Sequence, residues 1–181
     1  KMRGGARIGH AQVQDSMFLD GLEDAYDKGR LMGTFAEDCA MHFQFSRAAQ
    51  DAYALRSQQR AAAAWEAEKF KDHLVGITVP QGKGASLNFA TDEGVRPNTT
   101  LESLSQLKPI NGGVVTAGNA SQQNDAAAAC LVVAEDQLEA LGLTPSAYLV
   151  GWAAAGCHPA TMGIGPVPAV EKLFKRTGLG F

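Results

Sequence analysis

The sequence has few cysteines and no long apolar run, and these absences exclude several classes of protein. Among its 181 residues are three cysteines, an odd number without any Cys-x-x-Cys spacing. This argues against a disulfide framework or a zinc site and suits a reducing cytoplasm. The longest apolar run, residues 126–134, is far too short to span a bilayer, and the basic, glycine-rich start is not a signal peptide. We therefore expect a cytoplasmic protein.

The chain also lacks a strong excess of charge of either sign. Lys and Arg number 16 against 19 Asp and Glu, which gives a net charge of −3. No overall field then favours nucleic acid or an anionic membrane, and we expect neither as a partner. The hydrophobic content of 45% and the charged content of 19% indicate a globular protein of one or two domains with enough apolar residues for a core.

Two helices are predicted between residues 34 and 69. Thr34, with a glutamate three residues later, has the spacing of a capping box and predicts a first helix over residues 35–43. Ser46 predicts the cap of a longer helix over residues 47–69, which is rich in strong helix formers. The apolar side of this longer helix is predicted from residues at helical spacing: Ala48, Ala52, Leu55 and Ala62.

Short β-like patterns lie on both sides of these helices. Polar and apolar residues partly alternate over residues 7–14, which predicts a strand or hairpin arm. Residues 74–79 and 86–90 indicate two strands around a glycine-rich loop. Thr99, again with a glutamate three residues later, predicts a short helix that continues to residue 107.

The remainder of the chain has the pattern of alternating strands and helices. Residues 126–134 and 147–156 are predicted to be buried strands, and the helix after each is predicted to end at a glycine, Gly142 or Gly178. This β-α-β-α alternation is typical of a parallel sheet. Two strands and two helices cannot cover both faces of such a sheet, so apolar surface should stay uncovered.

The predicted fold class is therefore α/β, with two parts. Residues 1–108 would form an α+β loop domain, and residues 109–181 would form the start of a βαβα layered domain that is incomplete in this chain.

Residues 112–125, with the sequence GGVVTAGNASQQND, are the most informative stretch. Gly112, Gly113 and Gly118 allow unusual backbone angles and the close approach of another molecule. Four further residues supply more donors and acceptors than a plain turn needs: Asn119, Ser121, Asn124 and Asp125. A long polar ligand would use such a turn.

Five segments together resemble the thiolase family, the acyl-CoA acetyltransferases that make or cleave 3-ketoacyl-CoA. In chain order they are MRGGARIGHAQVQDSM (2–17), LMGTFAEDCA (31–40), TDEGVRPNTTLESLSQLKP (91–109), the stretch 112–125 and GCHPATMGIGPVPA (156–169). The resemblance covers essentially the whole chain, but only the middle of a thiolase. It implies an acetyl-CoA acetyltransferase or 3-ketoacyl-CoA thiolase of fatty acid metabolism that works through a cysteine thioester. CoA and acyl-CoA would be its substrates, with no tightly bound cofactor.

The resemblance also implies which residues contact CoA. Arg96 matches the arginine that lies against the nucleotide, and Ser103 matches a serine near it. Ala117 matches the alanine that walls the pantetheine arm, and Ser121 matches the serine that hydrogen-bonds it. The remaining matches are Leu31 and Met32, which contact the same ligand, and Met162, which lines the acyl pocket. Without the resemblance, these residues have ordinary interpretations as surface, turn or core residues.

No catalytic residue is assigned in this chain. Cys157 and His158 are adjacent and would point to opposite sides of an extended segment, so they are rejected as a catalytic pair. Cys39 and Cys130 are predicted to be buried small hydrophobes. In a thiolase the nucleophile's segment would precede residue 1, and the activating histidine and second cysteine would follow residue 181. The 181-residue chain alone is therefore predicted to be inactive.

Two features of the resemblance keep other interpretations open. Ala126 and His158 depart from the usual thiolase pattern, so a noncatalytic CoA- or lipid-binding thiolase-like protein is the alternative function. In thiolases the segment that matches residues 7–14 is a hairpin that packs one dimer on another. A homo-oligomer, dimer or tetramer, is therefore expected for the full-length protein.

Overall fold

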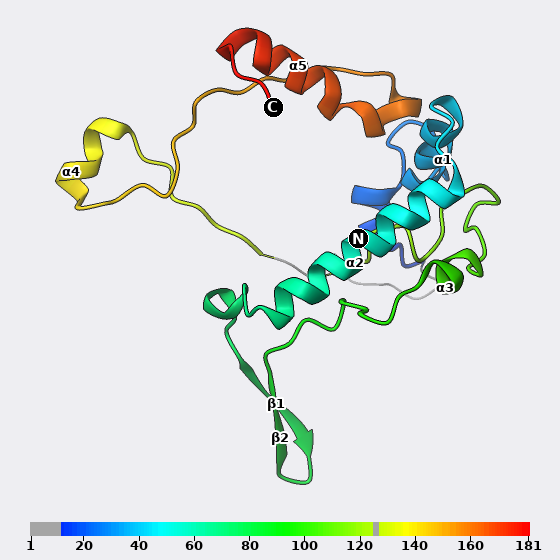
Figure 1. Cartoon of the computed structure of the whole chain (residues 1–181), viewed down its shortest axis with the longest axis horizontal. Helices are drawn as coiled ribbons and strands as arrows, with labels where there is room; N and C mark the ends of the chain where they lie inside the picture. The colour runs from blue at the N-terminus through cyan, green and yellow to red at the C-terminus, as the bar shows by residue number, and fades with distance from the viewer. Residues whose placement is uncertain (1–11, 125–126) are drawn as a thin grey trace. The chain divides into compact units, whose positions relative to one another are not determined.

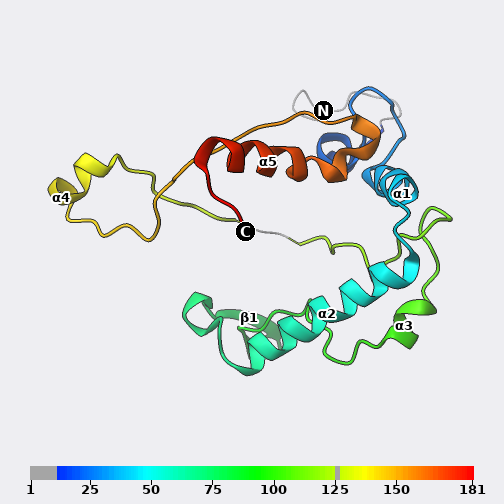
Figure 2. The same cartoon turned by 45° about the horizontal axis from the view of Figure 1, so that its top comes forward.

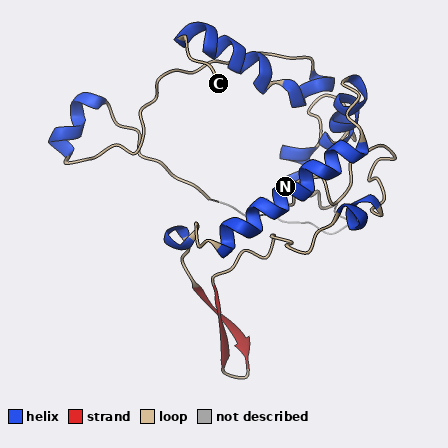
Figure 3. Cartoon of the chain, in the orientation of Figure 1, coloured by secondary structure: helices blue, strands red, loops and turns tan. Residues whose placement is uncertain are grey.

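The structure is a computed structural model that describes residues 12–124 and 127–181. Its contacts divide the chain into two compact units. Unit 1 contains the described residues up to Gln44 together with Pro145–Phe181, and unit 2 is Phe45–Thr144. Figure 1 labels the elements of both units, and Figure 3 distinguishes helix from strand. The predicted hairpin arm at residues 7–14 falls almost wholly outside the described residues.

Helix α2 (Arg47–Glu66) is the long helix of unit 2. The Ser46 hydroxyl accepts a hydrogen bond from the Ala49 amide at 3.1 Å, which confirms the predicted cap. The helix ends before the predicted residue 69, because Glu68 adopts a left-handed backbone with φ of 51° that no α-helix continues through. A short 3₁₀ helix, η2 (Lys71–His73), follows.

The side of α2 that packs overlaps the predicted apolar side only in part. Ala48 and Ala52 are exposed, whereas Leu55 and Ala62 are half-buried. The buried residue of the helix is Asp51. The prediction was wrong at the two exposed alanines, since the hydrogen bonds of the buried Asp51, and not apolar spacing alone, decide which face of this helix is covered.

Strands β1 (Ile77–Gly82) and β2 (Ala85–Phe89) pair antiparallel as a hairpin, which confirms the two strands predicted in this region. They form the sheet found in the described part of the chain. Lys83 and Gly84 connect them, both with positive φ (48° and 78°). Two such residues match the right-handed twist of paired strands, so this short connection suits a hairpin.

Helix α3 (Leu101–Ser105) starts one residue later than the sequence predicts. Its cap is Thr100, whose hydroxyl accepts from the Ser103 amide at 3.1 Å, and not Thr99. The Thr99 hydroxyl instead donates to the Arg96 carbonyl at 2.7 Å. The prediction was wrong about the cap because two adjacent threonines offer the same chemistry in neighbouring registers.

The end of unit 2 differs from the predicted strand and helix. Residues 127–134 form no strand, and Cys130 among them is exposed and not buried. A 3₁₀ turn, η3 (Glu135–Gln137), leads into α4 (Leu138–Leu141). Gly142 ends α4 with φ of 63°, as predicted.

Unit 1 begins with a π-helical turn, η1 (Phe18–Leu22), and helix α1 (Met32–His42). The helix starts earlier than the predicted Phe35, and Thr34 lies inside its first turn, where its hydroxyl donates to the Leu31 carbonyl at 2.7 Å. Thr34 is therefore not the cap, contrary to the prediction. Phe35 and Ala40 are the buried residues of this helix.

The second part of unit 1 contains η4 (Pro159–Ile164), a 3₁₀ segment, and α5 (Pro166–Thr177). Gly178 ends α5 with φ of 71°, as predicted. The loop at residues 147–156 runs beside α5, as the turned view in Figure 2 shows. The Lys172 ammonium donates to the Ala154 carbonyl at 2.9 Å, and Arg176 donates to the Trp152 carbonyl at 3.3 Å.

Residues 147–156 form no strand, so the strand prediction was wrong here as it was at residues 127–134. Both differences have the same cause. A parallel strand needs a neighbouring strand for its hydrogen bonds, and neither segment has one in the described structure. Their apolar side chains are exposed, with Val132 at 86% and Leu149 at 83%. The expectation of uncovered apolar surface is thereby confirmed.

No helix over residues 12–124 and 127–181 has the length and apolar character that crossing a membrane requires.

The cap of α2 gives a first prediction. Ser46→Ala removes the acceptor for the Ala49 amide and should lower the free energy of unfolding by about 1 kcal/mol. Urea denaturation measures this change. Ser57→Ala is the control, because Ser57 is exposed within the same helix and alanine is the stronger helix former. Equal destabilisation by both substitutions would contradict a role for the cap.

Candidate functional site

The candidate site in unit 2 is organised around the carboxylate of Asp51, which is only 3% exposed. One carboxylate oxygen accepts from Arg47 Nε at 2.7 Å, and the other accepts from Asn119 Nδ2 at 3.1 Å. The Arg47 guanidinium also donates to the carbonyls of Leu104 and Leu107 at 2.6 and 3.0 Å. The end of α3 and the turn near residue 119 are thus both attached to the first turns of α2.

Asn119 shapes the predicted ligand turn from inside. Its Oδ1 accepts from the Thr116 amide at 2.8 Å, and its Nδ2 donates to the Val114 carbonyl at 2.9 Å. Thr116 is fully buried, and its carbonyl accepts from the amides of Asn119 and Ala120. The side chain of Asn119 therefore satisfies main-chain groups that a loop would otherwise leave to water.

Two glycines of the stretch have special positions: Gly112 has the unusual backbone angle that the sequence predicts, and the close approach at Gly118 is to this chain and not to another molecule. Gly112 has φ of 77°, a value that favours glycine. At Gly118 an added Cβ would lie 2.5 Å from methyl groups of both Leu104 and Leu107. The turn therefore packs directly on the end of α3. Ala117 and Ser121, the residues predicted to contact pantetheine, are both exposed on it.

Ser103, predicted near the nucleotide, takes part in the capping box of α3. Its hydroxyl accepts from the Thr100 amide at 3.1 Å and donates to the Thr100 carbonyl at 2.9 Å. Because the single hydroxyl proton is already donated to the Thr100 carbonyl, the Ser103 hydroxyl could only accept a hydrogen bond from a ligand.

Arg96 lies in a segment without helix or strand and is exposed. Its main chain is fixed at both ends, because its amide donates to Gln58 Oε1 at 2.8 Å and its carbonyl accepts from the Thr99 hydroxyl. Gly94 lies against Gln122, whose Nε2 would clash with an added Cβ. This segment is therefore close to the 112–124 stretch.

In unit 1, a tight loop leads to Leu31 and Met32. Asp24 Oδ1 accepts from the amides of Tyr26 and Asp27 at 2.8 and 2.7 Å. Glu23 forms an isolated antiparallel bridge with Leu31. Arg30 pairs with Asp38 of α1 and lies over the ring of Phe35 at 4.2 Å. Leu31 is thus half-buried at the start of α1, and Met32 beside it is 40% exposed.

Backbone N–H groups lower the pKa values of two acidic residues in this loop, Glu23 and Asp24. The Gly29 amide, at 2.7 Å, holds the pKa of Glu23 below its ordinary 4.5, while desolvation opposes the shift and Lys28 adds to it. The amides of Asp27 and Tyr26 hold the pKa of Asp24 below 3.8. Both carboxylates are therefore stabilised in the charged form that the loop requires.

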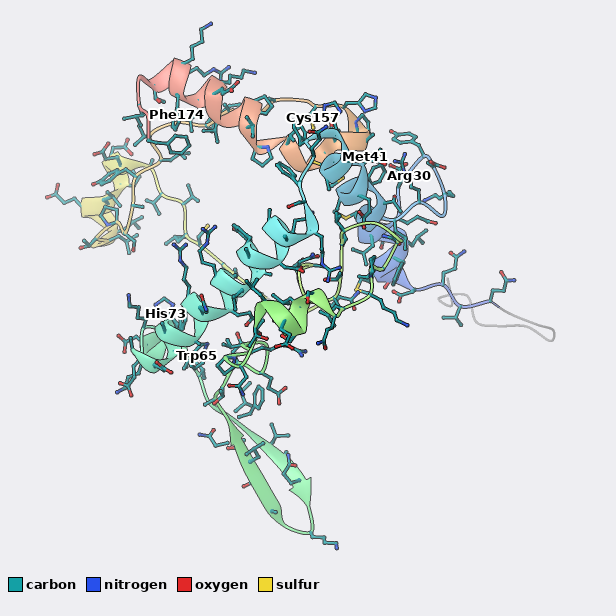
Figure 4. All side chains as sticks on the ribbon, turned by 45° about the vertical axis from the view of Figure 1, so that its right-hand side comes forward. Arg30, Met41, Trp65, His73, Cys157 and Phe174 are labelled. Carbon is teal, nitrogen blue, oxygen red and sulfur yellow. The ribbon has the colours of Figure 1, made fainter. Side chains whose placement is uncertain are left out.

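Met162 lies in η4, which packs on α1. An added Cβ on the next residue, Gly163, would be 3.5 Å from the Cys39 sulfur. Met162 itself is 41% exposed, and its carbonyl is 3.9 Å from the Cys157 sulfur. Figure 4 shows Cys157 with the side chains around α1.

His158 has a local structural role. Its Nδ1 accepts from the Ala160 amide at 3.2 Å and thereby caps η4. This contact commits the Nδ1 nitrogen of the imidazole to the backbone. Cys39, predicted to be buried, is half-buried in α1.

The predicted site residues are divided between the two units. Arg96, Ser103, Ala117 and Ser121 belong to unit 2, while Leu31, Met32 and Met162 belong to unit 1. Sequence reasoning missed Arg47, Asp51 and Gln58, which hold the unit 2 residues in place. An acidic residue four positions after Arg47 in an alanine-rich helix is the signal that was available.

In the described part of the chain, no group of three His, Cys, Asp or Glu side chains could hold a metal ion. Among the predicted contacts of unit 2, the Arg96 guanidinium and the hydroxyls of Ser103 and Ser121 belong to exposed residues. Such groups can bind a phosphorylated, amide-containing ligand.

Comparisons with known proteins identify relatives of the whole chain. Residues 1–136 match the family described as "Thiolase, N-terminal domain". An acetyl-CoA acetyltransferase of Thiocystis violacea is 46% identical over 180 residues, which are 98% of this chain and 45% of the relative. An acetyl-CoA acetyltransferase of Pseudomonas aeruginosa is 47% identical over 178 residues, 97% of this chain and 45% of the relative.

Solved structures give the same result. The crystal structure of the Bacillus anthracis acetyl-CoA acetyltransferase superposes with a TM-score of 0.83 at 36% identity, covering 100% of this chain and 46% of that one. The crystal structure of human mitochondrial 3-ketoacyl-CoA thiolase superposes with a TM-score of 0.78 at 37% identity, covering 98% of this chain and 45% of that one. The chain thus spans less than half the length of the relatives it matches.

The buried carboxylate gives a second prediction. Asp51→Asn keeps the shape of the side chain but places an NH₂ group against Arg47 or Asn119, both of which donate to this residue. A buried donor is left unpaired, so the free energy of unfolding should fall by about 2 kcal/mol or more. Glu68→Gln is the control, because its pair with Lys71 is exposed and should contribute less than about 1 kcal/mol. Equal effects in urea denaturation would contradict the importance of burial.

The loop before Leu31 gives a prediction about pH. Because the pKa of Glu23 is lowered on folding, its contribution to stability is present above pH 4.5 and is lost as the pH falls through the folded pKa. The stability difference between the wild type and Glu23→Gln should therefore be constant above pH 4.5 and shrink below it. Urea denaturation at several pH values measures this, and a difference that grows toward acid would contradict the assignment.

Proposed function

This chain belongs to the thiolase family and has the α/β thiolase-like fold, and from this we propose that it is the CoA-binding middle portion of an acyl-CoA acyltransferase. The whole enzyme would form or cleave acetoacetyl-CoA or 3-ketoacyl-CoA through a cysteine thioester. The observation that carries the proposal is the identity of 46 to 47% with acetyl-CoA acetyltransferases over nearly the whole chain.

The geometry of unit 2 supports a role in binding the carrier. Ala117 and Ser121 are exposed on a turn whose backbone is fixed by Asn119. A small side chain next to a hydroxyl suits a narrow pantetheine arm, and an exposed arginine suits the phosphorylated nucleotide. We assign Arg96 to the nucleotide, with Ser103 near it, and Ala117 and Ser121 to the arm.

For unit 1 we propose that Leu31 and Met32 contact the ligand and that Met162 lines the acyl pocket. All three are apolar, and both methionines are partly exposed at element starts or turns. Flexible, apolar methionine suits a wall against an acyl group. None of the three could transfer a proton or act as a nucleophile, so they would bind and orient while other parts of the enzyme perform the chemistry.

We further propose that the whole enzyme is a cytoplasmic homodimer or homotetramer that serves fatty acid metabolism, with CoA and acyl-CoA as substrates and no tightly bound cofactor. The uncovered apolar residues at positions 127–134 and 147–156 support assembly with further chain or subunits.

Calorimetry with CoA tests the proposed site. In the full-length enzyme, Arg96→Ala should weaken CoA binding by about tenfold, because it removes a charge-assisted contact to the nucleotide. Arg60→Ala is the control, since it removes the same charge from an exposed position on α2. Equal losses for both variants would indicate a general charge effect and contradict the assignment of Arg96.

Activity measurements separate the proposal from its alternative. The full-length enzyme should cleave acetoacetyl-CoA in the presence of CoA, and the 181-residue chain alone should not. Turnover by the chain alone would contradict the absence of catalytic residues from it. Binding of CoA by the full-length protein without turnover would favour the noncatalytic CoA- or lipid-binding alternative.

A further inference from the structure

The segment that carries Arg96 has no helix or strand to hold it. Residues 90–100 form turns and loop only, and Arg96 is exposed among them. An exposed arginine on a loose loop would lose much conformational freedom on binding a ligand, and that loss would weaken binding. The contacts that restrain this segment therefore influence how tightly Arg96 could bind a ligand.

A single side chain from a distant element anchors the main chain of Arg96. Gln58 of α2 accepts a hydrogen bond from the Arg96 amide through Oε1 at 2.8 Å. Gln58 is half-buried, whereas the arginine it supports is exposed. The carbonyl of Arg96 accepts from Thr99, and the peptide groups on both sides of the residue are therefore restrained.

Gln58 lies on the same face of α2 as Asp51, two helical turns further along. Asp51 holds the turn with Ala117 through Asn119, and Gln58 holds the segment with Arg96. One rigid helix thereby fixes the spacing between the two parts of the proposed CoA site in unit 2. Gly94 also lies close to Gln122. This is a direct contact between the segment that carries Arg96 and the stretch that carries Ala117.

We propose that Gln58 is a positioning residue for CoA binding, which acts through Arg96 and not by contacting the acyl group. This inference rests on the proposed function. Gln58 would determine affinity for the nucleotide end of CoA while leaving the reacting end unchanged. Its loss should therefore change KM for CoA and leave kcat as it is.

The test uses the full-length enzyme and compares CoA with pantetheine, a thiol that lacks the nucleotide. Gln58→Met keeps an unbranched side chain of similar length and high helix propensity but removes the acceptor. It should raise KM for CoA about three- to tenfold, the effect of one lost hydrogen bond. Its kcat and its KM for pantetheine should stay within about twofold of wild type.

Two further variants keep the result interpretable. Gln59→Met changes the exposed neighbour on the same helix and should have no effect. In an Arg96→Ala background, Gln58→Met should add nothing, because the residue through which it acts is gone. If the variant folds poorly, this double-mutant comparison still separates positioning from stability, since a folding defect would persist without Arg96.

The outcomes for this inference and for the proposed function are distinct. A wild-type enzyme that neither binds CoA nor cleaves acetoacetyl-CoA would overturn the proposed function. An active wild type in which Gln58→Met leaves KM for CoA unchanged, or raises KM equally for CoA and pantetheine, would overturn the role of Gln58 alone.

Discussion

The buried carboxylate of Asp51 is the constraint on which the candidate site of unit 2 depends. Removing a carboxylate from water costs free energy unless its oxygens are hydrogen-bonded, and here Arg47 and Asn119 supply those bonds. Arg47 is in turn bonded to the Leu104 carbonyl of α3, and Asn119 is bonded to the Val114 carbonyl within its own turn. A rearrangement of any one segment would leave a charged or polar group buried without a partner, so α2, α3 and the 114–120 turn hold a common arrangement.

Local signals in the sequence predicted much of the secondary structure. Ser46, Gly142 and Gly178 act at the helix ends where the sequence places them, because caps depend on one residue and its immediate neighbours. Thr34 and Thr99 were placed wrongly, since a hydroxyl three residues before a glutamate occurs by chance and a neighbouring residue can take the same role. Resemblance to thiolases supplied the family and the expected ligand contacts, which no local pattern could have given.

The network that supports the site could not be predicted in the same way. The bond between Asp51 and Asn119 joins residues that are 68 positions apart, and the bond between Gln58 and Arg96 spans 38 positions. A helical pattern identifies which residues share a face, but it does not identify which distant polar group will meet them. The two missing strands have a similar cause, because residues 127–134 and 147–156 have β-like composition and lack the partners that pairing requires.

The exposed segment before η4 also affects how the 181-residue chain would behave as an isolated protein. Tyr148, Leu149, Val150 and Trp152 are all at least 60% exposed, and an unpaired run of this composition can add to a strand of another chain. Lys172 and Arg176 already occupy the carbonyls of Ala154 and Trp152, which leaves the residues before Trp152 as the open part of this edge. Residues 148–151 would therefore be one site of intermolecular aggregation of the isolated chain, together with the exposed residues 127–134, while the positive charges of α5 would protect the part that follows residue 151.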